Sequence, residues 1–391
     1  MKAVQLSRRD LAASALTCSI VLTFCSIAES QIFLGLAIVL FLSLRERPQW
    51  PPGALWAGAF LALTLVAAFA SGEPRTALPQ IKKLFLWSIL PLGASLYIDR
   101  AALIWPALFV ATASALVGFG QFYLKWQSAK AAHQDFYLAY VASRITGFMS
   151  HWMTFGAHMM IAFSLAGAVL LFSRKRRSRQ LFLCVLLAIF TVAILLGETR
   201  SIWLGTACSA VVLLAFWRPW AMPVLPLIAV GLYFASPQPV RERVDSIMRP
   251  HGEVDSNLHR VITRETGLRM IAAHPLLGLG PEGPGKHFRE YLPERWRNAP
   301  LPDGYYGHLH NVYLQYAAER GLPALACLLI FIAINVRSWL VKPSPLQYFA
   351  LAALTGLAAS GLFEHNLGDS EVLTLFLALF GLAAPQKRDE Q

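Results

Sequence analysis

The chain has 391 residues, of which 56% are hydrophobic and 14% are charged, and its mean hydropathy is +0.50. Soluble domains carry about 25% charged residues, so this composition excludes an ordinary soluble protein and predicts an integral membrane protein. The formal net charge is +12, but the basic residues flank apolar runs rather than covering one polar face. This pattern favours anionic lipid as the partner and argues against nucleic acid.

Apolar runs recur along the whole chain and predict an all-α integral membrane protein with about 12 transmembrane helices. We expect these near residues 11–28, 31–44, 54–71, 84–98, 102–124, 154–173, 181–197, 201–217, 220–236, 322–340, 346–362 and 371–384. The basic run at residues 174–179 predicts an inner-side loop, and threading from it places both termini on the same inner side. Near the start, Ser7-Arg8-Arg9-Asp10-Leu11 resembles a twin-arginine export signal. No small-x-small cleavage site follows, so we expect an uncleaved first span.

Three segments follow from this threading. Residues 1–236 carry the first nine spans, residues 237–309 form one large outer loop, and residues 310–391 carry the last three spans. Prolines punctuate the loop, which predicts short helices and turns that fold onto the bundle as a lid. The outer segments are also basic, against the usual inner-side bias. An outward-facing basic basin beside lipid suits the binding of a phosphorylated lipid.

One piece of the loop has helical periodicity, from Asn257 to His274. A helical wheel places the apolar residues Val261, Leu268 and Ala272 on one stripe. On either side of it lie the basic residues Arg260 and Arg264, which are i,i+4 neighbours, and Arg269. This pattern predicts a helix in the membrane interface whose guanidinium groups reach the lipid headgroups. A solvated basic surface helix would show the same periodicity.

His308-Leu309-His310-Asn311 lies where the loop re-enters the membrane. If the segment is helical, the i,i+2 spacing points the two histidines about 200° apart, so only one would serve a given site. Nearby arginines would favour the neutral imidazole, which suits a general base that deprotonates an alcohol. A histidine that caps an interfacial helix is the structural alternative. A His-x-His pair also suggests a metal, but no HExxH or DxD motif accompanies it, so we expect neither metal nor cofactor.

Arg200 follows the short polar stretch Gly197-Glu198-Thr199 between two apolar runs. A charge at this depth is costly unless it is paired or functional. Glu198 is one candidate partner, and a diphosphate is the other, because a planar guanidinium binds it well. Three further basic residues, Arg144, Lys82 and Lys83, are weaker cases of the same kind, since each could extend to the membrane surface instead. Glu364-His365-Asn366 and Asp369 face outward, and the sequence leaves open whether they position a substrate or close a turn.

Several of these residues match a known family. Arg260 precedes Pro275-Leu276-Leu277-Gly278-Leu279-Gly280, then come His308-Leu309-His310-Asn311-Val312-Tyr313-Leu314-Gln315 and Glu319-Arg320-Gly321-Leu322. This arrangement resembles the O-antigen ligase and polymerase superfamily, and the ligases are the closer match. Arg144-Ile145-Thr146-Gly147-Phe148 extends the resemblance. The family signature of His-Asn, nine residues, Gly, two residues and then Gly, Thr or Tyr is met by His310-Asn311 and Gly321, with Ala324 departing at the last place.

The resemblance implies a membrane glycosyltransferase of the GT-C kind in the bacterial inner membrane, with both termini cytoplasmic and the active site on the periplasmic side. The donor would be a glycan on undecaprenyl diphosphate and the acceptor a sugar hydroxyl of the lipid A core, with no metal, cofactor or nucleotide sugar. The family's catalytic histidine corresponds to His310 and its two essential arginines to Arg200 and Arg260. The other residues expected to bind the donor diphosphate are Arg264 and Arg144, and those expected to position substrate are Asn311, Arg269, Lys82, Lys83, His308 and His365. The oligomeric state is left open.

Other functions fit the sequence less well. An O-antigen polymerase would share the donor but usually has a second large basic outer loop, and residues 125–153 are short. The spacing from Arg269 to Gly280 is nevertheless a polymerase pattern. A flippase or transporter would place charges near the bilayer midplane on broken helices, whereas these spans are apolar in their middles. A lipid-binding scaffold without activity leaves His310 unexplained.

Overall fold

The computed structural model describes residues 7–173, 176–247, 256–298, 306–341 and 343–384, and the secondary structure within these ranges is entirely helical. The longer helices are α1 (Arg8–Leu22), α2 (Ile27–Ser43), α3 (Ala54–Ala70), α6 (Arg100–Ala131), α8 (Trp152–Phe172), α9 (Arg177–Leu196), α10 (Arg200–Trp217), α11 (Val224–Ala235), α13 (Ser256–Ala273), α15 (Val312–Val341), α16 (Pro345–Ser360) and α17 (Ser370–Leu382). Shorter helices are α4 (Leu78–Ile81), η1 (Lys82–Ser88), α5 (Ile89–Ser95), α7 (Phe136–Ala142), η2 (Pro219–Ala221), α12 (Gln238–Asp245), α14 (Gly283–Lys286), η4 (Phe288–Glu290), η5 (Glu294–Trp296) and η6 (Asn366–Gly368).

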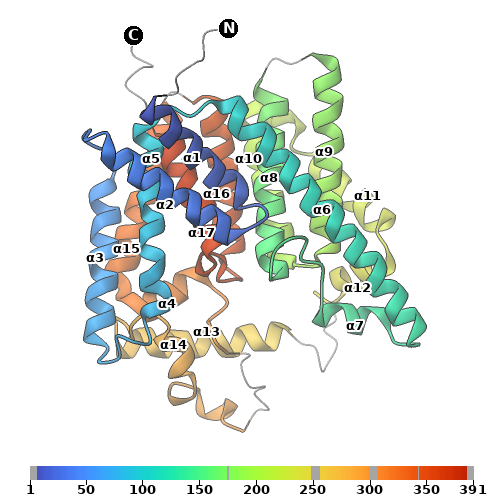
Figure 1. Cartoon of the computed structure of the whole chain (residues 1–391). Helices are drawn as coiled ribbons and strands as arrows, with labels where there is room; N and C mark the ends of the chain where they lie inside the picture. The colour runs from blue at the N-terminus through green and yellow to red at the C-terminus, as the bar shows by residue number, and fades with distance from the viewer. Residues whose placement is uncertain (1–6, 174–175, 248–255, 299–305, 342, 385–391) are drawn as a thin grey trace.

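Most of the helices run roughly along one direction as a bundle, and α13 lies across one end of it (Figure 1). The start of α1 and the end of α17 lie at the other end. In the described part of the chain, five helices are long and apolar enough to cross a membrane: α6, α8, α9, α10 and α15. Shorter apolar helices cover 27–43, 54–70, 219–235 and 370–382. The all-helical fold is therefore confirmed and is consistent with a membrane protein, while the number of twelve spans stays a prediction.

Two predicted spans differ in detail from the helices observed. The run near 84–98 is divided between η1 and α5, and the proline at position 91 removes a backbone donor there. The run near 322–340 starts earlier, because α15 begins at Val312 and continues past a non-helical residue, Gly321 (φ 82°, ψ 164°). Residues 174–175 of the basic run and residues 248–255 and 299–305 of the outer loop lie outside the described residues.

The bundle packs closely through small residues and exposes large apolar ones. A side chain at Gly205 of α10 would come within 2.6 Å of the Gly356 oxygen of α16, and one at Gly93 of α5 within 2.8 Å of Gly381 of α17. Such contacts let helix backbones approach, as is typical of membrane bundles. On the periphery, α11 buries none of its side chains, and Leu227 is 71% exposed. Outward-facing leucines of this kind suit contact with lipid rather than water.

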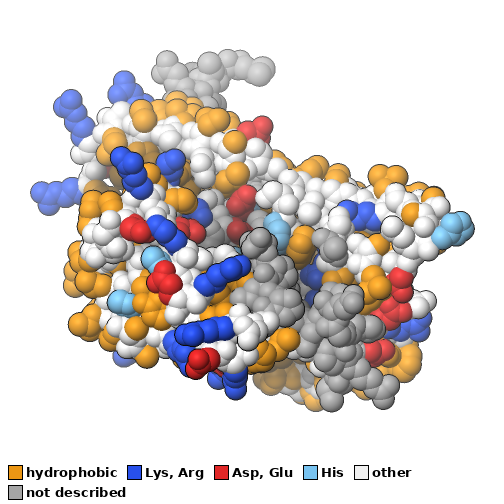
Figure 2. All heavy atoms as spheres, turned by 90° about the horizontal axis from the view of Figure 1, so that it is seen from below, with side chains coloured by type: hydrophobic (Ala, Val, Ile, Leu, Met, Phe, Trp, Pro, Cys, Tyr) orange, Lys and Arg blue, Asp and Glu red, His pale blue; other side chains and the backbone are white. Residues whose placement is uncertain are grey.

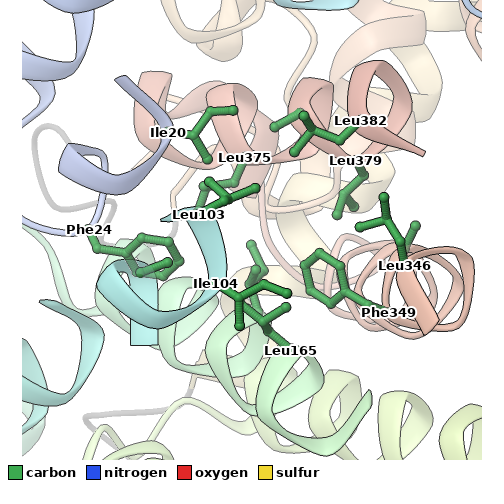
Figure 3. A pocket seen from close by; sticks show the side chains of 14 residues that line it. Ile20, Phe24, Leu103, Ile104, Leu165, Leu346, Phe349, Leu375, Leu379 and Leu382 are labelled. Carbon is green, nitrogen blue, oxygen red and sulfur yellow. The ribbon is translucent and has the colours of Figure 1, made fainter. Parts of the chain in front are cut away.

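An apolar cavity lies inside the bundle between α1, α6, α8, α16 and α17 (Figure 3). Its volume is about 50 Å³, and residues such as Phe24, Ile104, Leu165 and Phe349 line it. A cavity this small and this apolar offers no partner for a charged headgroup. Residues that could bind such a headgroup lie instead among the polar side chains at the α13 end of the bundle.

The predicted interfacial helix is present as α13, but its apolar stripe faces away from the protein. Val261 is 44% exposed and Leu268 is 49% exposed, whereas Ile262 and Met270 on another face are buried. These buried residues belong to a second small hydrophobic core whose other members are Phe288, Leu292, Leu309 and Ala318. The outer segment is thus held to α15 by its own core.

Candidate functional site

The His308–Asn311 segment is not helical, so the 200° separation that a helix would impose does not apply. Asn311 instead caps the start of α15: its Oδ1 accepts a hydrogen bond from the Leu314 N–H at 2.9 Å, and its Nδ2 donates to the Leu362 carbonyl at 2.8 Å. His310 has a φ of 47°, a left-handed conformation that is uncommon for a non-glycine residue. The two imidazole rings lie side by side, with centroids 4.2 Å apart. Both histidines therefore belong to one site.

Backbone hydrogen bonds form a clamp between the loop after α13 and α15. The loop after α13 crosses the break in α15, with Leu279 N–H donating to the Ala318 carbonyl and Leu322 N–H to the Pro275 carbonyl, both at 2.8 Å. A Cβ atom at Gly321 would lie 1.9 Å from the Leu276 oxygen, so only glycine fits there. The Pro275–Gly280 run and Gly321, on which the resemblance rested, are thus brought together by folding. Their role visible here is to fix the loop after α13 against the break in α15.

Glu364 joins the predicted histidine to a predicted arginine. It precedes α17 in the turn after α16, and it is only 2% exposed. Its Oε2 lies 3.1 Å from Nδ1 of His310, and its Oε1 accepts a hydrogen bond from Arg260 of α13 at 2.8 Å. Burial alone would raise the pKa of this carboxyl, but the hydrogen bonds and charges of His310 and Arg260 outweigh burial and lower it. Glu364 is therefore ionised at neutral pH.

The proton on His310 follows from this contact. An ionised carboxylate only accepts hydrogen bonds, so Nδ1 of His310 must donate to Glu364. In the neutral imidazole the remaining nitrogen, Nε2, then carries a free lone pair. A histidine oriented in this way by a carboxylate can take a proton from a hydroxyl group.

Three more histidines surround His310 and stay uncharged. The ring of His259 meets that of His310 edge-on at 4.7 Å, and His365 lies 5.9 Å from His308. Burial, followed by the charge of His310, lowers the pKa of His259 to about 3 and that of His308 to about 4. Burial also holds the pKa of His365 well below its usual value. Within the described residues, no three His, Cys, Asp or Glu side chains are grouped as a metal site would require.

Arg200 ties together the two helices of the outer segment that adjoin it. It is the first residue of α10, and its guanidinium donates to Asn257 Oδ1 at 2.9 Å and to the Ser246 carbonyl at 3.4 Å. Asn257 is near the start of α13, and Ser246 ends α12. The expected partner, Glu198, is not paired with it: among the described residues nothing donates a hydrogen bond to the Glu198 carboxylate. Glu198 adopts a left-handed backbone conformation, with a φ of 46°. Its side chain is buried, whereas that of Arg200 reaches Asn257.

Part of the chain that includes these residues is similar to a known protein family. Residues 182–329 match the family model described as O-antigen ligase. The chain carries an O-antigen ligase family domain. The resemblance predicted from sequence is thereby confirmed, and the domain supports an O-antigen ligase or polymerase activity. No curated protein matches the chain significantly.

The O-antigen ligase domain contains Arg200, Arg260 and His310, whereas Glu364 lies beyond the matched segment. The sequence leaves open whether Glu364 positions a substrate or closes a turn, and no motif singles out His259. The only available signal for Glu364 was its place beside His365 and Asn366 between two apolar runs. Its burial depends on the packing of α13 against the turn, which no local pattern reveals.

The remaining predicted residues are distributed unevenly around the domain. Arg144 is buried, 8% exposed, with its guanidinium 5.3 Å from the ring of Trp152. Lys83 donates to the Gly368 carbonyl. The other three basic residues predicted here are exposed and outside the histidine group: Arg264, Arg269 and Lys82. Seen from this end, the molecule shows Lys and Arg side chains among acidic and hydrophobic ones rather than one uniform basic patch (Figure 2).

Proposed function

We propose that the protein is an O-antigen ligase that transfers a glycan from undecaprenyl diphosphate to a sugar hydroxyl of the lipid A core. The observation that carries the proposal is the His310–Glu364–Arg260 contact at the end of the bundle, where two residues of the O-antigen ligase domain meet a buried carboxylate. We further propose a bacterial inner membrane location, with both termini cytoplasmic and this end of the bundle periplasmic.

His310 acts as the general base. Its Nε2 takes the proton of the acceptor hydroxyl while the oxygen attacks the anomeric carbon of the donor sugar. The bond from that carbon to the diphosphate breaks in the same step, so the sugar carbon is inverted. Glu364 stabilises the imidazolium that forms, because its charge lies 3.1 Å from Nδ1. General base catalysis typically contributes about 10²–10⁴-fold to a rate.

Arginines stabilise the leaving group. Undecaprenyl diphosphate gains negative charge as the glycosidic bond breaks, and well-placed donors contribute about 2–4 kcal/mol each to such a transition state. Arg200 is expected to bind the diphosphate from the α10 side. Arg260 is expected to bind it with the guanidinium N–H groups that its single contact with Glu364 leaves over. These charges take the part that a metal ion plays in many glycosyltransferases.

The acceptor separates a ligase from a polymerase, which would extend the glycan instead. Complementation of a ligase-null and a polymerase-null strain with the full chain distinguishes the two, with the lipopolysaccharide ladder as the readout. We expect rescue of the ligase-null strain alone. Rescue of the polymerase-null strain alone would mean that the acceptor is the glycan and not the lipid A core. Rescue of neither strain would contradict the proposed transfer.

Two further measurements test the setting of the reaction. Transfer should persist in excess EDTA without added divalent cation, whereas loss on chelation and recovery with Mg²⁺ or Mn²⁺ would contradict the arginine mechanism. Cysteines introduced at residues 237–309 should react with an impermeant thiol reagent from outside. Those introduced at 174–179 should react only after permeabilisation, and the reverse pattern would overturn the topology.

A further inference from the structure

A second group of buried charges lies around the turn between α9 and α10. It consists of Arg144 from the loop before α8, Glu198 from the turn itself and Arg243 from α12. Their exposures are 8%, 0% and 5%. Three separate elements therefore direct ionisable side chains into one interior region. Of the arginines, the transfer mechanism described above uses only Arg200 and Arg260, so Arg144 and Arg243 have no part in it.

These charges are poorly satisfied by the protein. Arg243 donates from Nε to the backbone carbonyl of Glu198 at 3.2 Å. Arg144 stacks on Trp152, but in the described part of the chain no group accepts a hydrogen bond from its guanidinium, and its buried Nε has no partner. Both carboxylate oxygens of Glu198 are likewise buried without a partner there. Buried guanidinium groups are costly unless they are paired, and they bind phosphate oxygens well.

Glu198 does not neutralise the two arginines at pH 7. Burial outweighs the attraction of Arg144 and Arg243 and raises the pKa of Glu198 to about 8, so the side chain is mostly a neutral acid. Burial and the charge of Arg243 lower the pKa of Arg144 to about 10, which still leaves it cationic. The region thus holds two positive charges beside a group that can donate a hydrogen bond.

The position of the group links it to the proposed reaction site. Glu198 is two residues before Arg200, and Arg200 donates to the carbonyl of Ser246 at the end of α12, the helix that carries Arg243. Arg144 also lies within electrostatic reach of Glu364. The group is therefore situated beside both Arg200 and the His310–Glu364 pair.

We propose that Arg144, Arg243 and Glu198 form a phosphate-binding site, in which the two guanidinium groups bind the phosphate oxygens and the acid of Glu198 donates to one of them. The site rests on the proposed function in that its ligand is a phosphate of a lipid substrate. That phosphate belongs either to the diphosphate of the donor or to a phosphate ester on the acceptor. Arg144 was expected from sequence to bind the donor, and the structure supplies the two residues that complete a site around it.

Binding of lipid to the purified full chain tests the site without requiring transfer. The probes are undecaprenyl diphosphate and rough lipopolysaccharide before and after phosphatase treatment. Arg243→Gln should weaken binding of one phosphorylated probe at least tenfold, and Arg243→Lys should recover part of the loss. Arg241→Gln is the matched control, because Arg241 is exposed on the same short helix. Its affinity should stay within twofold of the wild type.

The pattern of losses identifies the ligand. Weakened binding of undecaprenyl diphosphate assigns the site to the donor, and weakened binding of phosphorylated but not dephosphorylated lipopolysaccharide assigns it to the acceptor. Wild-type affinity of Arg243→Gln for both probes overturns the proposal. If the phosphorylated probes bind in this residue-dependent way but no glycan is transferred, the site stands and the proposed function fails.

The pH dependence of binding tests the part assigned to Glu198. The groups that act on it are Arg144, Arg243, Glu242 and Tyr140, and burial keeps Tyr140 neutral by raising its pKa. Above about pH 8 Glu198 ionises and competes with the phosphate, so wild-type affinity should fall several-fold between pH 7 and pH 9. Glu198→Gln should bind as the wild type does at pH 7 and lose the pH dependence. The same fall in both proteins would show that Glu198 does not contact the ligand, and unchanged melting temperatures would exclude misfolding as the cause.

Discussion

Two groups of buried charge at the α13 end of the bundle differ in how completely the protein satisfies them. In the first, Glu364 contacts both Arg260, at 2.8 Å, and His310, at 3.1 Å. In the second, Arg144, Glu198 and Arg243 share only one hydrogen bond, which goes to a backbone carbonyl. Since burial makes an unpaired charge costly, a satisfied group suits the orientation of a catalytic side chain, and an unsatisfied one suits a ligand that completes it.

The strongest test of the first group is the removal of its base. His310→Ala should lower the rate of transfer about 10²–10⁴-fold, because His310 combines a carboxylate partner with a ring nitrogen that can accept the proton. Binding of undecaprenyl diphosphate should change little. Kinetics and lipid binding measured on the same preparation check both statements. A large loss of donor affinity would mean that His310 binds the diphosphate rather than the hydroxyl.

The two arginines of the proposed mechanism should respond differently to substitution. Arg200→Ala and Arg260→Ala should each lower kcat/KM about 10²-fold through loss of diphosphate stabilisation. Lysine should restore part of this at Arg200. Lysine should restore less at Arg260, because the arginine side chain also donates a hydrogen bond to Glu364 at 2.8 Å. Substitution of Arg260 should therefore lower kcat as well as donor affinity. Equal recovery by lysine at both positions would contradict the link between Arg260 and the base.

Glu364 gives the next largest effect. Glu364→Gln keeps the shape of the side chain but removes the charge that stabilises the imidazolium, and we expect a rate loss of about 10–100-fold. The lowered pKa of Glu364 means that this carboxylate is ionised at neutral pH, where transfer is measured. Its stabilising contribution is lost only as pH falls through that lowered pKa.

Two controls show whether Glu364 acts through His310. Adding Glu364→Gln to His310→Ala should cost little more than His310→Ala alone, because residues that work as a unit are not additive. Glu371→Gln, in the first turn of the neighbouring α17, should leave both the rate and the pH profile close to wild type. Full additivity of the two substitutions would assign Glu364 a separate role, such as holding α13 in place.

Much of the helical architecture could be predicted from the sequence, because long apolar runs require helices in a membrane and the 3.6-residue period revealed α13. The pairing of Glu364 with His310 could not, since it joins residues 54 positions apart across a turn. The same holds for the left-handed conformation of His310, because no local sequence pattern indicates it. Local sequence patterns thus predict the helices, whereas long-range packing decides which charged side chains contact one another.

The smallest expected effect concerns His308, whose ring touches that of His310 but has no carboxylate beside it. Its Nδ1 is buried without a partner in the described part of the chain, and the lowered pKa, about 4, keeps the ring neutral at working pH. His308 therefore packs against the base and contributes no charge to the reaction. His308→Gln should lower the rate less than about fivefold and leave the pH profile unchanged, measured beside His310→Gln as the matched substitution. If His308→Gln abolishes transfer while His310→Gln does not, the roles of the two rings are exchanged, and the Glu364 contact orients a spectator rather than the base.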